Sequence, residues 1–127
     1  MPRLVSTCAL LAAIAVLATT PVLASAGPQA QAARKCHLTR SEQDNLGTSY
    51  VLTLRVDGTR CANGKKVVRA YHRCRRANGG RDGRCKREVY GYRCSERRLD
   101  VIPSQYDARV RCKKPGREIF HIYTQNT

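Results

Sequence analysis

Apolar and polar residues alternate with a period of two in the middle of the chain, over residues 50–57. One side of an extended backbone there carries Tyr50, Leu52, Leu54 and Val56. Successive side chains of a strand point to opposite faces, so this pattern predicts a β-strand over 50–57. Asp57 and Gly58 are typical of a turn that ends it, and Thr59 is expected to cap the helix that follows.

The pattern then changes to a helical period over residues 61–76. On a wheel of about 100° per residue, one side collects apolar and sulfur-bearing side chains and the opposite side collects cations. The first side consists of Cys61, Gly64, Val67, Val68, Tyr71 and Cys74, and the second of Lys65, Lys66, Arg69, Arg73 and Arg76. We expect an amphipathic helix in which Gly64 allows close approach to a sheet. A glycine-rich stretch from Asn78 ends this helix.

Three further segments are predicted to form strands of an antiparallel meander, over 88–96, 106–113 and 118–124. A loop over 97–105 separates the first two, and a Lys-Pro-Gly turn separates the last two. The fold class that results is α+β. One N-terminal strand precedes one amphipathic helix, which packs on a small antiparallel meander, and disulfides staple the domain.

The last of these strands alternates two pairs of side chains. Phe120 and Ile122 are expected to face inward, and His121 and Tyr123 to face outward.

The start of the chain has the pattern of a secretory signal peptide. A short positive region precedes an apolar run, and Ala24, Ser25 and Ala26 form a small-residue cleavage site. We therefore expect a signal peptide over 1–26, and a retained membrane anchor is the alternative. Once the signal is removed, we expect no membrane span. A mostly irregular spacer over 27–47 would then precede a single small domain over 48–127.

Six of the seven cysteines lie beyond the predicted signal peptide: Cys36, Cys61, Cys74, Cys85, Cys94 and Cys112. An even number in a short exported chain indicates three disulfides, and fifteen pairings are open. A Cys74–Cys85 bridge would pin the glycine-rich loop. Folding the meander about residue 103 would place Cys94 opposite Cys112, which leaves Cys36 with Cys61. The chain has no Trp and one Phe, so its small core needs such staples.

The net positive charge of the chain favours some classes of binding partner over others. The chain has 24 Lys and Arg against 9 Asp and Glu, a formal net charge of +15. Such a surface attracts anionic polymers, whereas a merely solvated basic surface is the alternative. We expect anion binding on the cationic helix side, made by Lys65, Lys66, Arg69, Arg73 and Arg76. The neighbouring cations expected to help are Arg75, Arg81, Arg84, Lys86 and Arg87.

The sequence motifs give little support to a metal site or to a nucleophilic serine. Cys36 with His37, and His72 with Cys74, look like ligands, but there is no Cys-x-x-Cys pair and export favours bridged sulfur. No serine lies in a nucleophile elbow. We expect no metal and no cofactor.

One enzyme hypothesis remains. The predicted helix is followed by strands that carry, in turn, a Glu, an Arg and a His. This order resembles that of the small microbial guanyl-type ribonucleases, and residues 121–124 resemble their C-terminal histidine strand. The resemblance implies His121 with Glu88 or Glu96 as acid and base, and Arg109 or Arg111 beside the phosphate. The intervening loops are much shorter here, and the family's other motif residues are missing.

A broader resemblance covers residues 50–123. A Cys-x-x-small helix from Cys61, a Gly-aromatic-x-Cys strand at 91–94 and a Val-x-Cys strand at 110–112 are similar to short exported proteins of high-GC Gram-positive bacteria. That resemblance implies the fold and export, and it does not indicate an activity.

The function that these observations favour is a secreted, extracellular or cell-envelope binding module without enzymatic activity. Its partner would be a cell-wall polymer, a polysaccharide, a nucleic acid or an acidic protein surface. The alternatives are a hydrolase-inhibitor-like module that presents the loop 78–84, and the ribonuclease-like enzyme.

Overall fold

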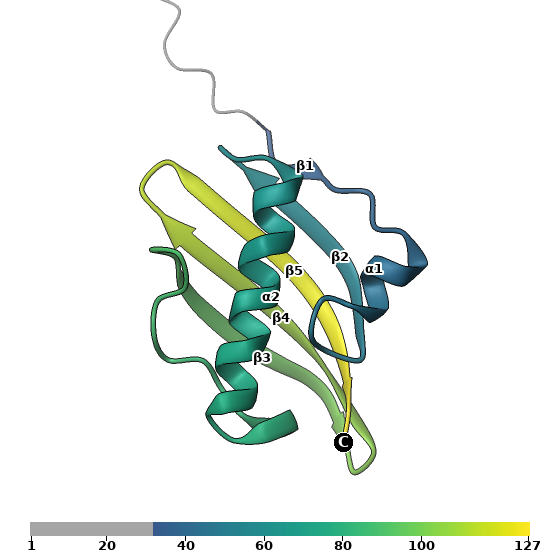
Figure 1. Cartoon of the computed structure of the whole chain (residues 1–127). Helices are drawn as coiled ribbons and strands as arrows, with labels where there is room; N and C mark the ends of the chain where they lie inside the picture. The colour runs from purple at the N-terminus through teal and green to yellow at the C-terminus, as the bar shows by residue number, and fades with distance from the viewer. Residues whose placement is uncertain (1–31) are drawn as a thin grey trace, which may run out of the picture.

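The computed structural model describes residues 32–127, so the expected signal peptide and the first part of the expected spacer lie outside the described residues. In chain order the elements are β1 (Arg34–Lys35), α1 (Arg40–Asp44), β2 (Tyr50–Asp57), α2 (Cys61–Ala77), the 3-10 helix η1 (Gly80–Asp82), β3 (Arg93–Ile102), β4 (Gln105–Lys114) and β5 (Arg117–Asn126). The strands form one antiparallel sheet of order β1-β2-β5-β4-β3. Helix α2 crosses one face of this sheet (Figure 1), which confirms the predicted α+β class. Within residues 32–127, no helix is both long enough and apolar enough to cross a membrane.

Three disulfides fasten these elements together, in the pairing that the sequence predicts. Cys36–Cys61 joins the segment after β1 to the first turn of α2, with an S–S distance of 2.05 Å. Cys74–Cys85 ties the end of α2 to the following loop, and Cys94–Cys112 is a cross-strand pair between β3 and β4. Bridges of this number indicate that the protein folds in an oxidising environment.

The expected spacer contains more structure than its composition indicates. It holds β1 and the one-turn helix α1, which begins after Thr39. The Thr39 hydroxyl accepts from the backbone amide of Glu42, and the Glu42 carboxylate accepts from the backbone amide of Thr39. This Thr-x-x-Glu capping box satisfies two free amides at the helix start, and it is the local signal for α1.

The segment before β4 corrects the sequence prediction. The expected strand over 88–96 and the expected loop over 97–105 are replaced by a turn over 88–92 and by β3. Tyr90 and Gly91 have φ values of 50° and 74°, which an extended strand does not allow. Strand β4 has ten residues with which β3 can pair, so β3 continues to Ile102. Only Pro103 and Ser104 then connect the two strands.

The facing of β5 is the reverse of the prediction. His121 and Tyr123 are buried beneath α2, whereas Phe120 and Ile122 are half-buried on the opposite face. The register explains this, because His121 lies opposite Val110, whose side chain belongs to the helix-facing side of β4. Both alternations along β5 contain apolar residues, so the local pattern does not distinguish them.

A bulge also changes the start of β2. The register shifts between Val51 and Thr53, so Val51 becomes buried, while Tyr50 and Leu52 are 45% and 50% exposed. The buried side of β2 is therefore Val51, Leu54 and Val56, in place of a continuous alternation from Tyr50.

At the start of α2, the N-cap residue differs from the prediction, whereas the packing of Gly64 agrees with it. The N-cap residue is Arg60, which makes no side-chain cap, and the Thr59 hydroxyl accepts from Asn63 Nδ2 at 2.9 Å instead. The helix begins one residue too late for the Thr59 hydroxyl to cap it. Gly64 is buried against β2, as predicted, and a methyl group placed on it would lie 2.7 Å from Cγ1 of Val56.

Gly64→Ala is therefore expected to destabilise the protein although it raises helix propensity. The steric cost of an added methyl group in a packed core is about 1–3 kcal/mol, and the gain in propensity is about 1 kcal/mol. Denaturant unfolding under non-reducing conditions measures the difference. Combining Gly64→Ala with Val56→Ala removes the clashing methyl group, so the double-mutant cycle should show a favourable coupling. A more stable Gly64→Ala protein would contradict this packing.

Candidate anion-binding surface

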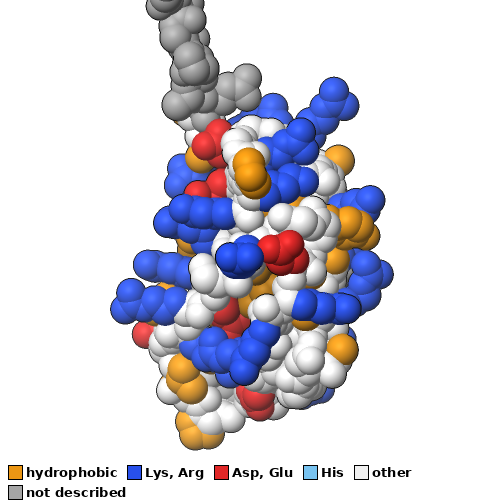
Figure 2. All heavy atoms as spheres, turned by 90° about the vertical axis from the view of Figure 1, so that its left-hand side faces the viewer, with side chains coloured by type: hydrophobic (Ala, Val, Ile, Leu, Met, Phe, Trp, Pro, Cys, Tyr) orange, Lys and Arg blue, Asp and Glu red, His pale blue; other side chains and the backbone are white. Residues whose placement is uncertain are grey.

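The solvent-facing side of α2 carries cations without acidic neighbours on the same helix. Lys66, Arg69, Arg73 and Arg76 are exposed, and the 17 residues of α2 include no Asp or Glu. At a rise of 1.5 Å per residue, these four side chains extend over about 15 Å of helix. Figure 2 views the left-hand side of Figure 1, and there lysine and arginine side chains outnumber carboxylates over the surface. The predicted cationic side of the helix is therefore present for these four residues.

Lys65, which the sequence places in the same set, has a different role. Its Nζ atom lies 2.6 Å from Oε1 of Glu42, and its side chain is only 20% exposed. The hydrogen bond from Lys65 is the main reason why the pKa of Glu42 is lowered. Lys65 thus joins α2 to α1 and does not belong to the free cations.

Arg75 is predicted to be one of the neighbouring contact cations, but its side chain is completely buried. Its guanidinium donates to the carbonyl oxygens of Gly83 and Arg81, at 3.1 Å and 2.6 Å. The spacing of four residues from Tyr71 was the signal that Arg75 lies on the buried side of α2. Arg75 holds the loop after α2 from inside the protein.

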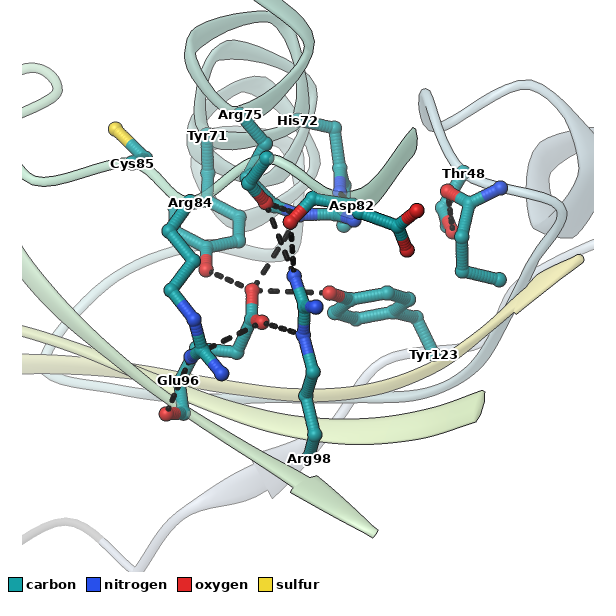
Figure 3. Close-up of polar contacts among 12 residues, drawn as sticks. Thr48, Tyr71, His72, Arg75, Asp82, Arg84, Cys85, Glu96, Arg98 and Tyr123 are labelled. Carbon is teal, nitrogen blue, oxygen red and sulfur yellow. Dashed lines mark hydrogen bonds and ion pairs between the residues drawn. The ribbon is translucent and has the colours of Figure 1, made fainter. Parts of the chain in front are cut away.

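Glu96 is the counterion of this buried guanidinium (Figure 3). Its carboxylate accepts hydrogen bonds from Tyr71 and Tyr123 at 2.5 Å and 2.9 Å, and from Nε of Arg98 at 2.8 Å. Nε of Arg75 lies 3.4 Å from the same group, whose side chain is 4% exposed. Burial alone would raise the pKa of Glu96, but the hydrogen bonds from Tyr71, Arg98 and Tyr123 outweigh burial and lower it. Burial raises the pKa of both tyrosines, so they remain donors.

Two histidines extend this buried cluster. Nη1 of Arg75 lies 2.9 Å from Nδ1 of His72, and a guanidinium only donates, so Nδ1 of His72 accepts. His72 therefore carries its proton on Nε2, which donates to Nε2 of His121 at 3.2 Å. The proton of His121 then lies on Nδ1, which has no hydrogen-bond partner among the described residues. Burial lowers the pKa of His72, and it lowers the pKa of His121 to about 3.

The four residues of the ribonuclease hypothesis do not meet in one site. Glu96 and His121 share the helix-facing side of the sheet, where Val110 lies between them in register and α2 covers both. Arg109 lies on the opposite face, and Glu88 lies in the turn before β3. Among residues 32–127, no three His, Cys, Asp or Glu side chains are arranged to hold a metal ion.

The loop over 78–84 is held firmly beside α2. Its carbonyl oxygens accept from three buried or half-buried side chains, those of Arg75, Arg98 and Tyr106. Arg84 is half-exposed, and its Nη1 lies 3.5 Å from Oε1 of Glu96. The side chain of Arg81 remains exposed.

A hollow of about 360 Å³ adjoins the end of α2 and is lined by Asn78, Arg84, Lys86 and Arg87. Lys86 and Arg87 of this hollow are exposed and form no salt bridge within residues 32–127, whereas its third cation, Arg84, pairs with Glu96. We call the combined set the helix–loop surface, and its residues are Lys66, Arg69, Arg73, Arg76, Lys86 and Arg87.

Comparison with known proteins gives no relative: no family model, no curated protein and no solved structure matches this chain.

Proposed function

We propose that this protein is a secreted, non-enzymatic module that binds an anionic polymer through the helix–loop surface. The observation that carries the proposal is the charge of that surface. Within the described residues, none of its six cations forms a salt bridge, whereas Lys65, Arg75 and Arg98 each pair with a carboxylate. Lys66 also contacts an aromatic ring, since its Nζ lies 4.5 Å from the centroid of Tyr90, but its side chain is still exposed to solvent.

The spacing of these cations favours a polymer over a single small anion. Lys66, Arg69, Arg73 and Arg76 follow one another at intervals of three or four residues, which places each beside the next on α2. Like charges at these intervals destabilise a helix by about 0.2–0.5 kcal/mol for each pair. A polyanion lying along α2 would relieve this repulsion at several positions together and would release its own counterions. A cell-wall polymer, an acidic polysaccharide and a nucleic acid all have this character.

Export and rigidity support the same proposal. Three disulfides need an oxidising compartment, and the sequence pattern of a signal peptide provides a route to it. The Cys74–Cys85 bridge and the hydrogen bonds of Arg75 hold Lys86 and Arg87 next to α2, so little ordering is needed when a ligand binds. A binding role is also favoured because His121 is enclosed beneath α2 and cannot reach a substrate.

Replacing Arg69, Arg73 and Arg76 together with glutamine is expected to weaken binding to heparin and to flatten its dependence on salt. Each lost contact should lower the slope of log K against log salt by about 0.7–0.9, so the triple variant should lose about 2–3. Titrations between about 50 and 200 mM salt measure this slope.

The matched control removes three exposed charges from the edge strand β1 and from α1, in Arg34→Gln, Lys35→Gln and Arg40→Gln. We expect this control to change the slope much less than the helix variant. Equal slopes for the two triple variants, or no binding of heparin at low salt, would contradict the proposal.

A further inference from the structure

The face of the sheet that points away from α2 forms a second surface. Helix α2 covers one face only, as Figure 1 shows. On the other face, the strand register places Arg55, Phe120 and Arg111 in one row across β2, β5 and β4. The next row contains Ile122 and Arg109, followed by Arg97 on β3. Phe120 thus has an arginine on both sides, whereas Ile122 lies between Arg109 and Thr53.

Phe120 is the centre of this open face. It is half-buried, so part of the residue remains accessible to solvent. A hollow of about 280 Å³ lies beside it and is lined by Ala33, Arg55, Asp57, Arg111, Glu118 and Phe120. The guanidinium carbon of Arg111 lies 6.0 Å from the centroid of the Phe120 ring, and its Nε lies 3.1 Å from Glu118.

A second aromatic ring lies further along the same face. Tyr50 is 45% exposed and pairs with Thr124, four residues beyond Phe120 on β5. At about 3.3 Å per strand residue, the two positions are separated by about 13 Å along the strand direction. The face therefore offers aromatic rings at two points, on the neighbouring strands β2 and β5.

The charges of the open face are predominantly positive. Within residues 32–127, Arg55, Arg97 and Arg109 form no salt bridge, while Arg111 and Lys113 share Glu118. Charge alone would suit any polyanion, and a sugar ring packs on an aromatic side chain only through its C–H groups, whereas a nucleobase stacks on it through a planar aromatic face. Single-stranded nucleic acid supplies both groups, since its phosphates pair with cations and its bases stack on aromatic side chains.

We infer that the open sheet face binds single-stranded nucleic acid. A base stacks on the accessible part of Phe120, and the neighbouring phosphates pair with Arg55, Arg109 and Arg111. This site lies on the other side of the sheet from the helix–loop surface and does not depend on it. It also differs in selectivity, because it recognises bases in addition to charge.

The chain has no Trp, so Phe120→Trp introduces a single reporter at the site. The probe is an oligothymidylate of about ten nucleotides, compared with an abasic oligomer of the same length and charge. We expect the oligothymidylate to quench the tryptophan fluorescence and the abasic oligomer to leave it nearly unchanged. Phe120→Leu keeps the apolar packing and removes the ring, and it should weaken binding of the oligothymidylate about 5- to 150-fold.

The controls separate this inference from the proposed function. The triple glutamine variant at Arg69, Arg73 and Arg76 should retain the preference for oligothymidylate over the abasic oligomer. Equal binding of the two oligomers by the unmodified protein, or unchanged binding after Phe120→Leu, would overturn the inference even if heparin binding follows the helix–loop surface. Loss of the preference in a Phe120→Leu protein that keeps its three disulfides and its cooperative unfolding would support it.

Discussion

Glu96→Gln is expected to lower the free energy of unfolding by about 3–5 kcal/mol, the usual cost of removing one partner of a buried ion pair. Glu96 is the shared acceptor for Tyr71, Tyr123 and Arg98, and it faces the buried Arg75. Glutamine keeps the shape but removes the negative charge, and it also turns one oxygen acceptor into a donor. Two guanidinium groups then remain enclosed without a counterion.

Denaturant unfolding of the oxidised protein measures this effect. The matched control is Glu88→Gln, because Glu88 pairs with Arg93 at 3.2 Å on the surface, where both side chains are more than half exposed. An exposed pair contributes about 0–1 kcal/mol, so this variant should stay close to the unmodified protein. Similar losses for the two variants would show that Glu96 is not the centre of the buried cluster.

The second large effect is a loss of stability in acid, which arises from His72 and His121. Burial lowers the folded-state pKa of both below the ordinary value of 6.5, and that of His121 falls to about 3. Below pH 6.5 the unfolded chain therefore binds protons that the folded protein excludes, so the free energy of unfolding decreases as pH falls. A histidine whose proton is excluded contributes up to about 1.4 kcal/mol per pH unit, so His121 alone gives roughly 2 kcal/mol between pH 6.5 and 4.5, and His72 adds to this loss in the same direction.

The surroundings of the histidines give the reason for this direction. Nδ1 of His72 accepts from Arg75, so a proton added there would face a guanidinium. Glu96 lies nearby and favours the charged form of His121, but burial outweighs it. Glu96 itself has a lowered pKa, so its contribution is complete above about pH 4.5 and is lost only at lower pH. Below that value both effects act in the same direction.

Denaturant unfolding at a series of pH values between 7 and 4 tests this prediction. His121→Gln removes one of the two groups and should reduce the slope of stability against pH by about half. His37 is the third histidine and is exposed, so His37→Gln should leave the slope unchanged. A stability that stays constant from pH 7 to pH 5 would contradict the neutral histidine pair.

Local patterns were sufficient for the elements with strong periodicity. The strand over 50–57 has the bounds that its alternation predicts, and α2 extends one residue beyond the predicted range. The disulfide pairing could also be predicted, because the hairpin geometry places Cys94 opposite Cys112 and the short loop brings Cys74 to Cys85. These features depend on neighbours along the chain or on one hairpin.

The candidate surface was predictable only in part. Arg69, Arg73 and Arg76 lie on the exposed side of α2 as the helical wheel indicates. Lys65 and Arg75 are used inside the protein, because Glu42 and Glu96 approach them from other elements. A helical wheel shows which side of a helix a cation occupies, but it does not show which carboxylate of another element lies beside that cation.

The sequence by itself determined the cationic helix, the strand over 50–57, the last two strands of the meander and the number of bridges. Periodicity is a local property of the chain, and the number of bridges follows from the even cysteine count. Only the tertiary structure decided which side of β5 is covered by α2, because both alternations along that strand are apolar enough to be buried. That choice encloses His121 in the core and leaves Phe120 on the open face. It followed from the register of β4 with β5. That register is set by backbone pairing between two strands, so the local pattern of either strand does not reveal it.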